Sequence, residues 1–342
     1  MRQETIVLNE TRNVTLTAYL QEVEGEFVFP RRPGMLVLPG GGYAMCSDRE
    51  ADPVALAYLR AGYHAFVLRY SIGRHKAWPN PLEDYEQAME LIESRAEEWH
   101  LDTSRINAVG FSAGGHLCAC AATIARYKPA AAILVYPVIL KDICDRCQPG
   151  MPQPNEHVTA ETSPCFLAAC RDDHTVDVKN ALMMQLALAD KGVAFESHIY
   201  SYGGHGFSIG EDWIIEGSRS SRVPDWVGDS IGWLKELQGA LTRPGYTEPT
   251  AEGSLNADSA PVLSVACSLR HLRRQSDEVR AVLKPMLDAI QREANSKGCS
   301  MEALMAESGN NTARELMERL LVDADLIRKI DKALHSMVNE VR

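Results

Sequence analysis

The sequence lacks both a long apolar run and the cysteine spacing of a disulfide-bonded framework. No stretch of 18 consecutive apolar residues occurs in the 342 residues, and residues 1–14 mix apolar with polar side chains instead of forming the apolar core of a signal peptide. The nine cysteines are odd in number and scattered along the chain. We therefore expect no membrane span and a cytoplasmic protein with reduced thiols.

Patterns for binding a metal or a nucleotide are also missing. Cys144 and Cys147 form one C-x-x-C pair, but Cys165 and Cys170 do not supply the second pair that a zinc site needs. The acidic cluster at 172–177 has no metal-ligand spacing. The one run of three glycines lacks both the G-x-G-x-x-G spacing and a P-loop lysine. We expect neither a metal nor a cofactor.

Basic residues are scarce relative to acidic residues. The chain carries 35 Lys and Arg against 46 Asp and Glu, a formal net charge of −11. The excess is uneven, because residues 263–342 hold 13 basic against 12 acidic residues, whereas residues 1–262 hold 22 against 34. This balance disfavours nonspecific binding of nucleic acid and binding to an anionic membrane surface.

Residues 1–243 alternate strand-like and helix-like patterns. Apolar runs predict strands at 5–9, 15–20, 35–39, 64–70, 105–111, 131–137, 165–170 and 194–200. Apolar residues at helical spacing predict helices at 51–63, 81–99, 113–125, 178–192 and 224–241. Such alternation is typical of an α/β fold with a mostly parallel sheet covered by helices on both faces, so we expect one α/β domain over 1–243.

Two segments depart from this alternation. Residues 138–163 are polar, contain proline and cysteine, and show no periodicity. We interpret them as an insertion that forms either a lid-like pocket wall or a plain surface connection. Residues 244–262 are rich in Pro, Gly, Ser, Thr and Ala, which is the composition of a linker.

Residues 263–342 follow a wholly helical pattern. Pro285 predicts the start of a helix, Thr312 and Glu315 form a capping-box sequence, and Asp323 is a candidate N-cap for the last helix. The apolar face of that helix comprises Leu326, Ile327, Ile330, Leu334, Met337, Val338 and Val341. The segment 300–321 resembles a helix-turn-helix only loosely, so we expect a small bundle that packs on the first domain or mediates homo-oligomerisation rather than DNA binding.

The stretch Gly110-Phe111-Ser112-Ala113-Gly114 lies between a predicted strand and a predicted helix. A nucleophilic serine at a sharp strand-to-helix turn presents its hydroxyl above the sheet. Glycine two residues before and after removes side chains that would collide with the neighbouring strand and helix. The helix that follows directs its N-terminal amides toward a developing oxyanion. The stretch therefore predicts Ser112 as a nucleophile.

The three glycines 40–42 end the predicted strand 35–39. Glycines there let backbone N–H groups approach a substrate carbonyl, as an oxyanion hole requires. We expect the amides of Gly41 or Gly42, together with that of Ala113, to be the oxyanion donors. Tyr43, the next residue, is a candidate substrate contact.

Candidates for a base and its acid also follow predicted strands. Asp172 and Asp173 come after the strand 165–170, and His205 lies among glycines after the strand 194–200. A carboxylate in this place can orient an imidazole that takes the proton of a serine. The residues alone leave Asp172 and Asp173 as equal candidates. His116, one turn beyond Ser112, is expected to be a packing and hydrogen-bonding residue instead.

With these motifs the chain resembles the α/β-hydrolase superfamily and, within it, the branch of acetyl esterases and acetylxylan esterases, some of them named as xylanase-like. The order Ser112, Asp, His205 along the chain is the order of that superfamily. The matching motifs cover about residues 15–240 and are LPGGGY (38–43), LRYSIG (68–73), WPNPLEDYEQAMELI (78–92), RINAVGFSAGGHLCA (105–119), SPCFLAACRDDHTV (163–176) and YGGHGF (202–207).

The resemblance implies that the acid is Asp173, because in such enzymes it precedes a valine by three residues, here Val176. It implies a serine esterase that hydrolyses short-acyl esters, mainly acetyl esters of sugars or xylo-oligosaccharides, through an acyl-enzyme. The alternatives are a broad carboxylesterase or peptidase of the same fold, and a non-catalytic binding protein on a hydrolase scaffold. Pro39 and Phe111 replace a histidine and an aspartate found in hormone-sensitive-lipase relatives, and residues 263–342 lie outside the resemblance.

Overall fold

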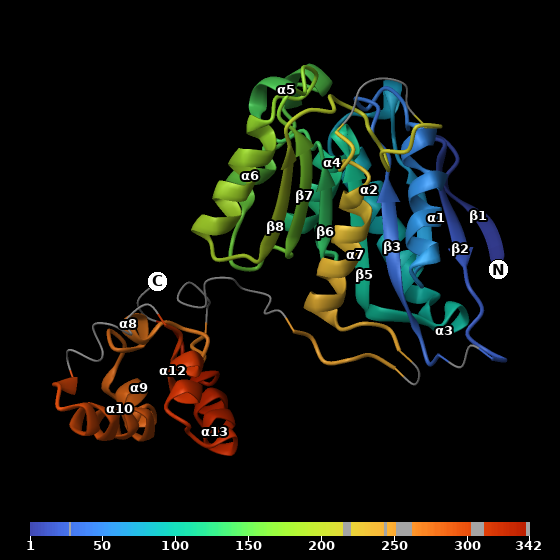
Figure 1. The fold of residues 1–342 in the computed structure, drawn as a ribbon. Helices are drawn as coiled ribbons and strands as arrows, with labels where there is room; N and C mark the ends of the chain where they lie inside the picture. The colour runs from blue at the N-terminus through green and yellow to red at the C-terminus, as the bar shows by residue number, and fades with distance from the viewer. Residues whose placement is uncertain (27–28, 215–219, 243–244, 251–261, 302–310, 340–342) are drawn as a thin grey trace. The chain divides into compact units, whose positions relative to one another are not determined.

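The chain folds into two compact units, Met1–Gly253 and Ser254–Arg342, in a computed structural model (Figure 1). The structure describes residues 1–26, 29–214, 220–242, 245–250, 262–301 and 311–339. No helix in these ranges is long and apolar enough to cross a membrane. Each unit is described by itself below.

An eight-stranded sheet forms the centre of the first unit, with the strand order β1-β2-β4-β3-β5-β6-β7-β8. β2 is antiparallel to β1 and β4, and the remaining neighbouring strands are parallel. The strands are β1 (Arg2–Asn9), β2 (Val14–Leu20), β3 (Arg32–Leu38), β4 (His64–Arg69), β5 (Leu101–Phe111), β6 (Ala132–Val135), β7 (Cys165–Cys170) and β8 (Phe195–Tyr200). All eight predicted strands overlap with these, and the predicted mostly parallel α/β fold is confirmed.

Helices cover both faces of this sheet (Figure 1). They are α1 (Asp52–Arg60), α2 (Asn80–Ser94), α3 (Ala96–Trp99), α4 (Ser112–Thr123), α5 (Lys141–Cys147), α6 (Lys179–Asp190) and α7 (Asp225–Gln238). Successive residues of β3 point to opposite faces, so Leu36 and Leu38 belong to the core on the side of α2, α4 and α6, whereas Met35 and Val37 belong to the core on the side of α1 and α7. The apolar run of β3 is therefore buried on both sides.

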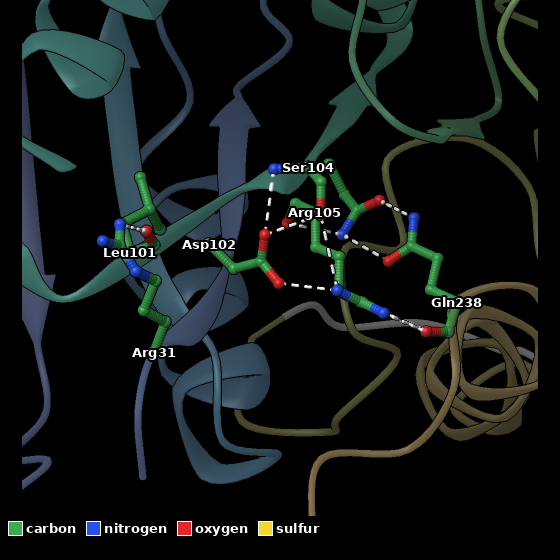
Figure 2. A network of polar contacts seen from close by, with 7 residues as sticks. Arg31, Leu101, Asp102, Ser104, Arg105 and Gln238 are labelled. Atoms are coloured by element: carbon green, nitrogen blue, oxygen red, sulfur yellow. Dashed lines mark hydrogen bonds and ion pairs between the residues drawn. The ribbon is translucent and has the colours of Figure 1, made fainter. Parts of the chain in front are cut away.

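The predicted helix 81–99 is two helices in the structure, because the chain breaks at Arg95 between α2 and α3. The next strand, β5, begins at Leu101, four residues before its predicted start. Its polar first residues are anchored at the end of α7. The Arg105 guanidinium lies between the Asp102 carboxylate, at 2.6 Å, and the carbonyl oxygen of Gln238, at 3.0 Å (Figure 2).

The predicted linker 244–262 is described only at residues 245–250 and 262, and the rest of it lies outside the described residues. Its first part packs on the first unit. Tyr246 forms a β-bridge with Leu241, and its ring lies 3.8 Å below the Arg105 guanidinium. Thr250 donates a hydrogen bond to the carbonyl oxygen of Glu236 at 2.8 Å. These residues therefore extend the α/β unit beyond residue 243.

The second unit is helical and has an apolar core of its own. Its helices within 262–301 and 311–339 are α8 (Leu269–Leu272), α9 (Asp277–Val282), α10 (Lys284–Lys297), α12 (Ala313–Arg319) and α13 (Ala324–Leu334). Pro285 lies in the first turn of α10, Thr312 and Glu315 form a reciprocal capping box on α12, and Asp323 caps α13. These three predictions are confirmed.

The predicted apolar face of the last helix is too long. Ile327, Ile330 and Leu334 are buried, but α13 ends at Leu334. Val338 lies beyond that end and is 68% exposed, and Val341 lies outside the described residues. Most of the helix-turn-helix comparison at 300–321 also falls on residues that the structure does not describe, 302–310.

Candidate functional site

A backbone turn between β5 and α4 holds Ser112. Phe111 is still extended, and Ser112 has a φ of +51°, a conformation that costs free energy for a residue with a side chain. A Cβ atom on Gly114 would lie 2.1 Å from the carbonyl oxygen of Leu38, and one on Gly110 would lie 2.2 Å from the carbonyl oxygen of Gly114. The glycines on either side of the serine are thus required by backbone-to-backbone contact.

His205 lies in the loop that follows β8. Gly204, directly before it, has a positive φ of 67° and donates its amide to the Asp172 carboxylate at 3.0 Å. Asp172 thereby fixes the loop on the N-terminal side of the imidazole. This contact gives the first of the two adjacent aspartates a role distinct from that of the second.

Ser112, His205 and Asp173 lie in one hydrogen-bonded row. The Ser112 Oγ atom is 3.0 Å from His205 Nε2, and His205 Nδ1 is 2.6 Å from Asp173 Oδ2. The structure therefore brings together three side chains that are far apart in the sequence, and the acid that meets the imidazole is Asp173.

Asp173 is held by the backbone after β7. Its Oδ1 atom accepts the amides of Thr175, at 2.8 Å, and Val176, at 2.9 Å, and its side chain is 1% exposed. A carboxylate with these bonds remains available to accept the Nδ1–H of His205. That tautomer leaves Nε2 as the acceptor for the Ser112 hydroxyl, which is the arrangement needed to remove its proton.

The glycine loop lies beside this row. The Gly40 amide donates to the Glu50 carboxylate at 2.8 Å. The amides of Gly41 and Gly42 have no acceptor among the residues that the structure describes. Ala113 follows Ser112 in the first turn of α4, where a helix leaves its amides without an intrahelical acceptor. The role of these three amides as oxyanion donors stays a prediction.

A cavity of about 550 Å³ opens over Ser112 and His205; we call it the Ser112 cavity. Gly41 and Gly42 line it together with the residues that follow them, Met45, Ser47, Asp48, Arg49 and Glu50. Across the cavity are Val138, Ile143 and Cys147 from the insertion 138–163, with Thr175 and Val176 from the Asp173 loop. The insertion contains the helix α5, which the sequence did not predict, and contributes a wall of the cavity.

The prediction that Tyr43 contacts substrate is wrong for its side chain. Tyr43 is fully buried, and its hydroxyl lies 2.8 Å from His116 Nδ1. His116 Nε2 lies 2.8 Å from the carbonyl oxygen of Pro152, in the insertion. Tyr43 and His116 therefore connect the glycine loop, α4 and the cavity wall, and the prediction that His116 packs and hydrogen-bonds is confirmed.

Sequence reasoning missed most residues of the cavity wall. Ile143 and Cys147 belong to a short, largely polar helix, and Arg49 and Glu50 lie in an ordinary-looking run after the glycine loop. Nothing in their spacing indicated a site. Among the described residues, no group of three or more His, Cys, Asp or Glu side chains is placed to hold a metal, and all nine cysteines are free thiols.

Because backbone oxygens lie so close to Gly114, we expect one added methyl group at this position to lower the free energy of unfolding strongly. Gly114→Ala should destabilise the protein by about 3 kcal/mol or more, because the new Cβ overlaps backbone oxygens that cannot move independently of β3. Gly228→Ala in α7 is the matched control, since open space surrounds that glycine, and it should stabilise by at most about 1 kcal/mol. Urea unfolding measures both; equal effects would refute the packing argument.

His116 predicts a pH dependence of stability. Burial lowers the pKa of His116 from 6.5 to about 4. The neutral, buried His116 therefore contributes fully to the free energy of unfolding above pH 6.5. As the pH falls from 6.5 toward 4, only the unfolded chain takes up a proton at this position, and the free energy of unfolding decreases by about 3 kcal/mol. Urea unfolding at pH 7.5 and at pH 4.5 measures this loss. The difference in unfolding free energy between the two pH values should be smaller in His116→Gln than in the wild-type protein. An unchanged difference would contradict the prediction.

Comparison with known proteins supports the assignment of the fold. The family model BD-FAE matches residues 30–133. The chain is 30% identical over 220 residues to endo-1,4-beta-xylanase B of Butyrivibrio fibrisolvens, covering 55% of this chain and 34% of that protein. It is 29% identical over 231 residues to an acetylxylan esterase of Xylanibacter ruminicola, covering 61% and 46%. The chain thus spans less than half the length of these two relatives.

A solved structure matches more than two thirds of the chain. It is an α/β hydrolase enzyme from a Medee basin deep-sea metagenome library, with 36% sequence identity and a TM-score of 0.65. The match covers 69% of this chain and 97% of that structure. With this match and the strand order, the chain belongs to the α/β-hydrolase superfamily.

Proposed function

We propose that the protein is a serine esterase and that Ser112, His205 and Asp173 carry the reaction. The observation that supports this most directly is the row of hydrogen bonds from Ser112 Oγ to His205 and from His205 to Asp173, at the floor of a cavity. The relative named acetylxylan esterase agrees with this class of reaction. A non-catalytic binding protein would have no need of this row.

The reaction proceeds in two acyl-transfer steps. His205 takes the proton of Ser112 as its Oγ attacks the ester carbonyl carbon, and the carbonyl oxygen becomes an oxyanion. The amides of Ala113 and of Gly41 or Gly42 donate to that oxyanion. Asp173 stabilises the imidazolium, which then protonates the leaving alcohol as the C–O bond breaks. A water molecule, activated by His205, attacks the acyl-enzyme and releases the acid and Ser112.

We further propose that the acyl group is short, mainly acetyl, and that the alcohol is a sugar or a xylo-oligosaccharide. The cavity volume of about 550 Å³ suits a small ligand. Its wall combines apolar side chains of the insertion with polar side chains at 47–49, which can bond to sugar hydroxyls. The name of the acetylxylan esterase relative points to the same substrate class. Homo-oligomerisation through the C-terminal helices stays a prediction.

Substitution of Ser112 and of the two adjacent aspartates tests which residues are the nucleophile and the acid. Ser112→Ala should lower kcat for 4-nitrophenyl acetate by at least about 10³-fold, and Asp173→Asn by about 10⁴-fold, because the imidazole then loses its orienting carboxylate. Asp172→Asn is the matched control, since an amide oxygen still accepts the Gly204 N–H. It should retain kcat within about threefold. Equal losses in both asparagine variants would reject Asp173 as the acid.

The substrate proposal is tested with a series of esters. We expect kcat/KM to fall by at least about tenfold from 4-nitrophenyl acetate to the octanoate, as the proposed specificity for a short acyl group requires. Acetate should also be released from acetylated xylobiose. A preference for octanoate would favour a broad carboxylesterase, and cleavage of a peptide anilide in preference to esters would favour a peptidase. A chain that no serine-reactive fluorophosphonate labels would be a binding protein.

A further inference from the structure

Glu50 is a buried carboxylate that has no cationic partner among the described residues. It is 3% exposed and lies at the end of the short 3₁₀ helix Asp48–Glu50, between the glycine loop and α1. Its Oε2 atom accepts the Gly40 amide at 2.8 Å, and its Oε1 atom accepts the Tyr136 hydroxyl at 2.7 Å. Burying a carboxylate costs free energy unless it is fully hydrogen-bonded. Both oxygens are occupied here, so the group is held in one position.

Tyr136 connects Glu50 to the loop that carries His205. It follows β6 and is 1% exposed, and its ring centroid lies 4.7 Å from that of His205. Its hydroxyl donates to Glu50 and accepts the Ser208 amide at 3.0 Å. Burial, with the nearby charge of Glu50, raises the pKa of Tyr136 well above 10, so the hydroxyl keeps the proton that it donates. The same hydroxyl therefore serves both neighbours.

The loop around His205 is thus tied at two points. Asp172 accepts the amide of Gly204 directly before the imidazole, and Tyr136 bonds to the amide of Ser208 three residues after it. The second tie continues through Glu50 to Gly40, which directly precedes Gly41. One hydrogen-bonded chain of two side chains therefore joins the loop with the oxyanion amides to the loop with the base.

We infer that Glu50 is a positioning residue that acts through Gly40 and Tyr136 to keep the oxyanion amides and His205 in register around Ser112. The inference rests on the proposed esterase function and adds to it a residue outside the reacting groups. Displacement of a reacting group by about 1 Å is enough to lower a rate about 100-fold, so a fixed spacing between the two loops has a direct effect on kcat. Binding of the substrate depends less on that spacing.

Tyr136→Phe tests this inference, with Tyr58→Phe as the matched control. Both variants remove a buried hydroxyl and keep the ring, but the Tyr58 hydroxyl bonds to Ser230 between α1 and α7, away from the Ser112 cavity. Tyr136→Phe should lower kcat about 10- to 100-fold and change KM less than about threefold, and Tyr58→Phe should leave kcat within about twofold. The thermal midpoint should fall further in Tyr136→Phe, because Glu50 Oε1 and the Ser208 amide both lose their partner, so kcat is measured well below both midpoints. If kcat falls equally in the two variants at that temperature, the inference is wrong.

Glu50 variants separate its two bonds. Glu50→Ala removes both acceptors, whereas Glu50→Gln keeps an oxygen for the Gly40 amide and offers an N–H to Tyr136. We expect Glu50→Gln to recover at least about tenfold in kcat over Glu50→Ala. The double variant Glu50→Ala/Tyr136→Phe should cost less than the product of the single losses, because both changes break the same connection. Multiplicative losses would contradict that connection.

The rate at which a fluorophosphonate modifies Ser112 tests the positioning role of Glu50 and Tyr136 separately from the proposed esterase activity. That rate reports the geometry around the nucleophile, whatever the natural ester is. If the wild-type protein is labelled but hydrolyses none of the esters, the esterase proposal fails, and slower labelling of Tyr136→Phe than of Tyr58→Phe still supports the positioning role. Equal labelling rates in these two variants would overturn it.

Discussion

The site depends on the close approach of two backbones. The first turn of α4 lies so near the end of β3 that there is no room for a side chain at Gly114. This contact places the N-terminus of α4 beside the glycine loop, and Ser112, at the start of α4, has a positive φ of 51°. The strain is maintained because β3 and β5 are central strands, buried on both faces of the sheet. The position of Ser112 therefore depends on the packing of the central strands β3 and β5.

The other groups reach the serine from the same edge of the sheet. Asp173 and His205 follow neighbouring parallel strands, β7 and β8, and the glycine loop follows β3. Parallel strands end at one edge, so short loops there can converge although their residues are far apart in the sequence. The loops do not rely on the strands alone, since Asp172, Tyr136 and Glu50 bond to their backbones.

Most of the fold was predictable from the sequence because its strands are short apolar runs and its helices have a regular apolar face. Ser112, His205 and the two aspartates were found because glycines and strand ends mark them. Spacing alone did not separate Asp172 from Asp173, since the difference lies in which one reaches the imidazole. α5 was missed because few of its residues are buried. The bond between Glu50 and Tyr136 joins residues 86 positions apart and has no local signature.

The wall of the Ser112 cavity belongs to a different part of the chain from the reacting groups. Val138, Ile143 and Cys147 come from one insertion, which is fastened to α4 through His116 and to α6 through Asn180. Among the described contacts, Val138 bonds to Ser112 only through the backbone, since its amide donates to the Ser112 carbonyl oxygen at 3.1 Å. The side chains of Val138, Ile143 and Cys147 bond to neither Ser112 nor Asp173 in the described residues. Substitutions of these side chains can therefore change which ligands the cavity accepts without moving Ser112, His205 or Asp173. Homologous chains with this fold can in this way acquire different ligand preferences.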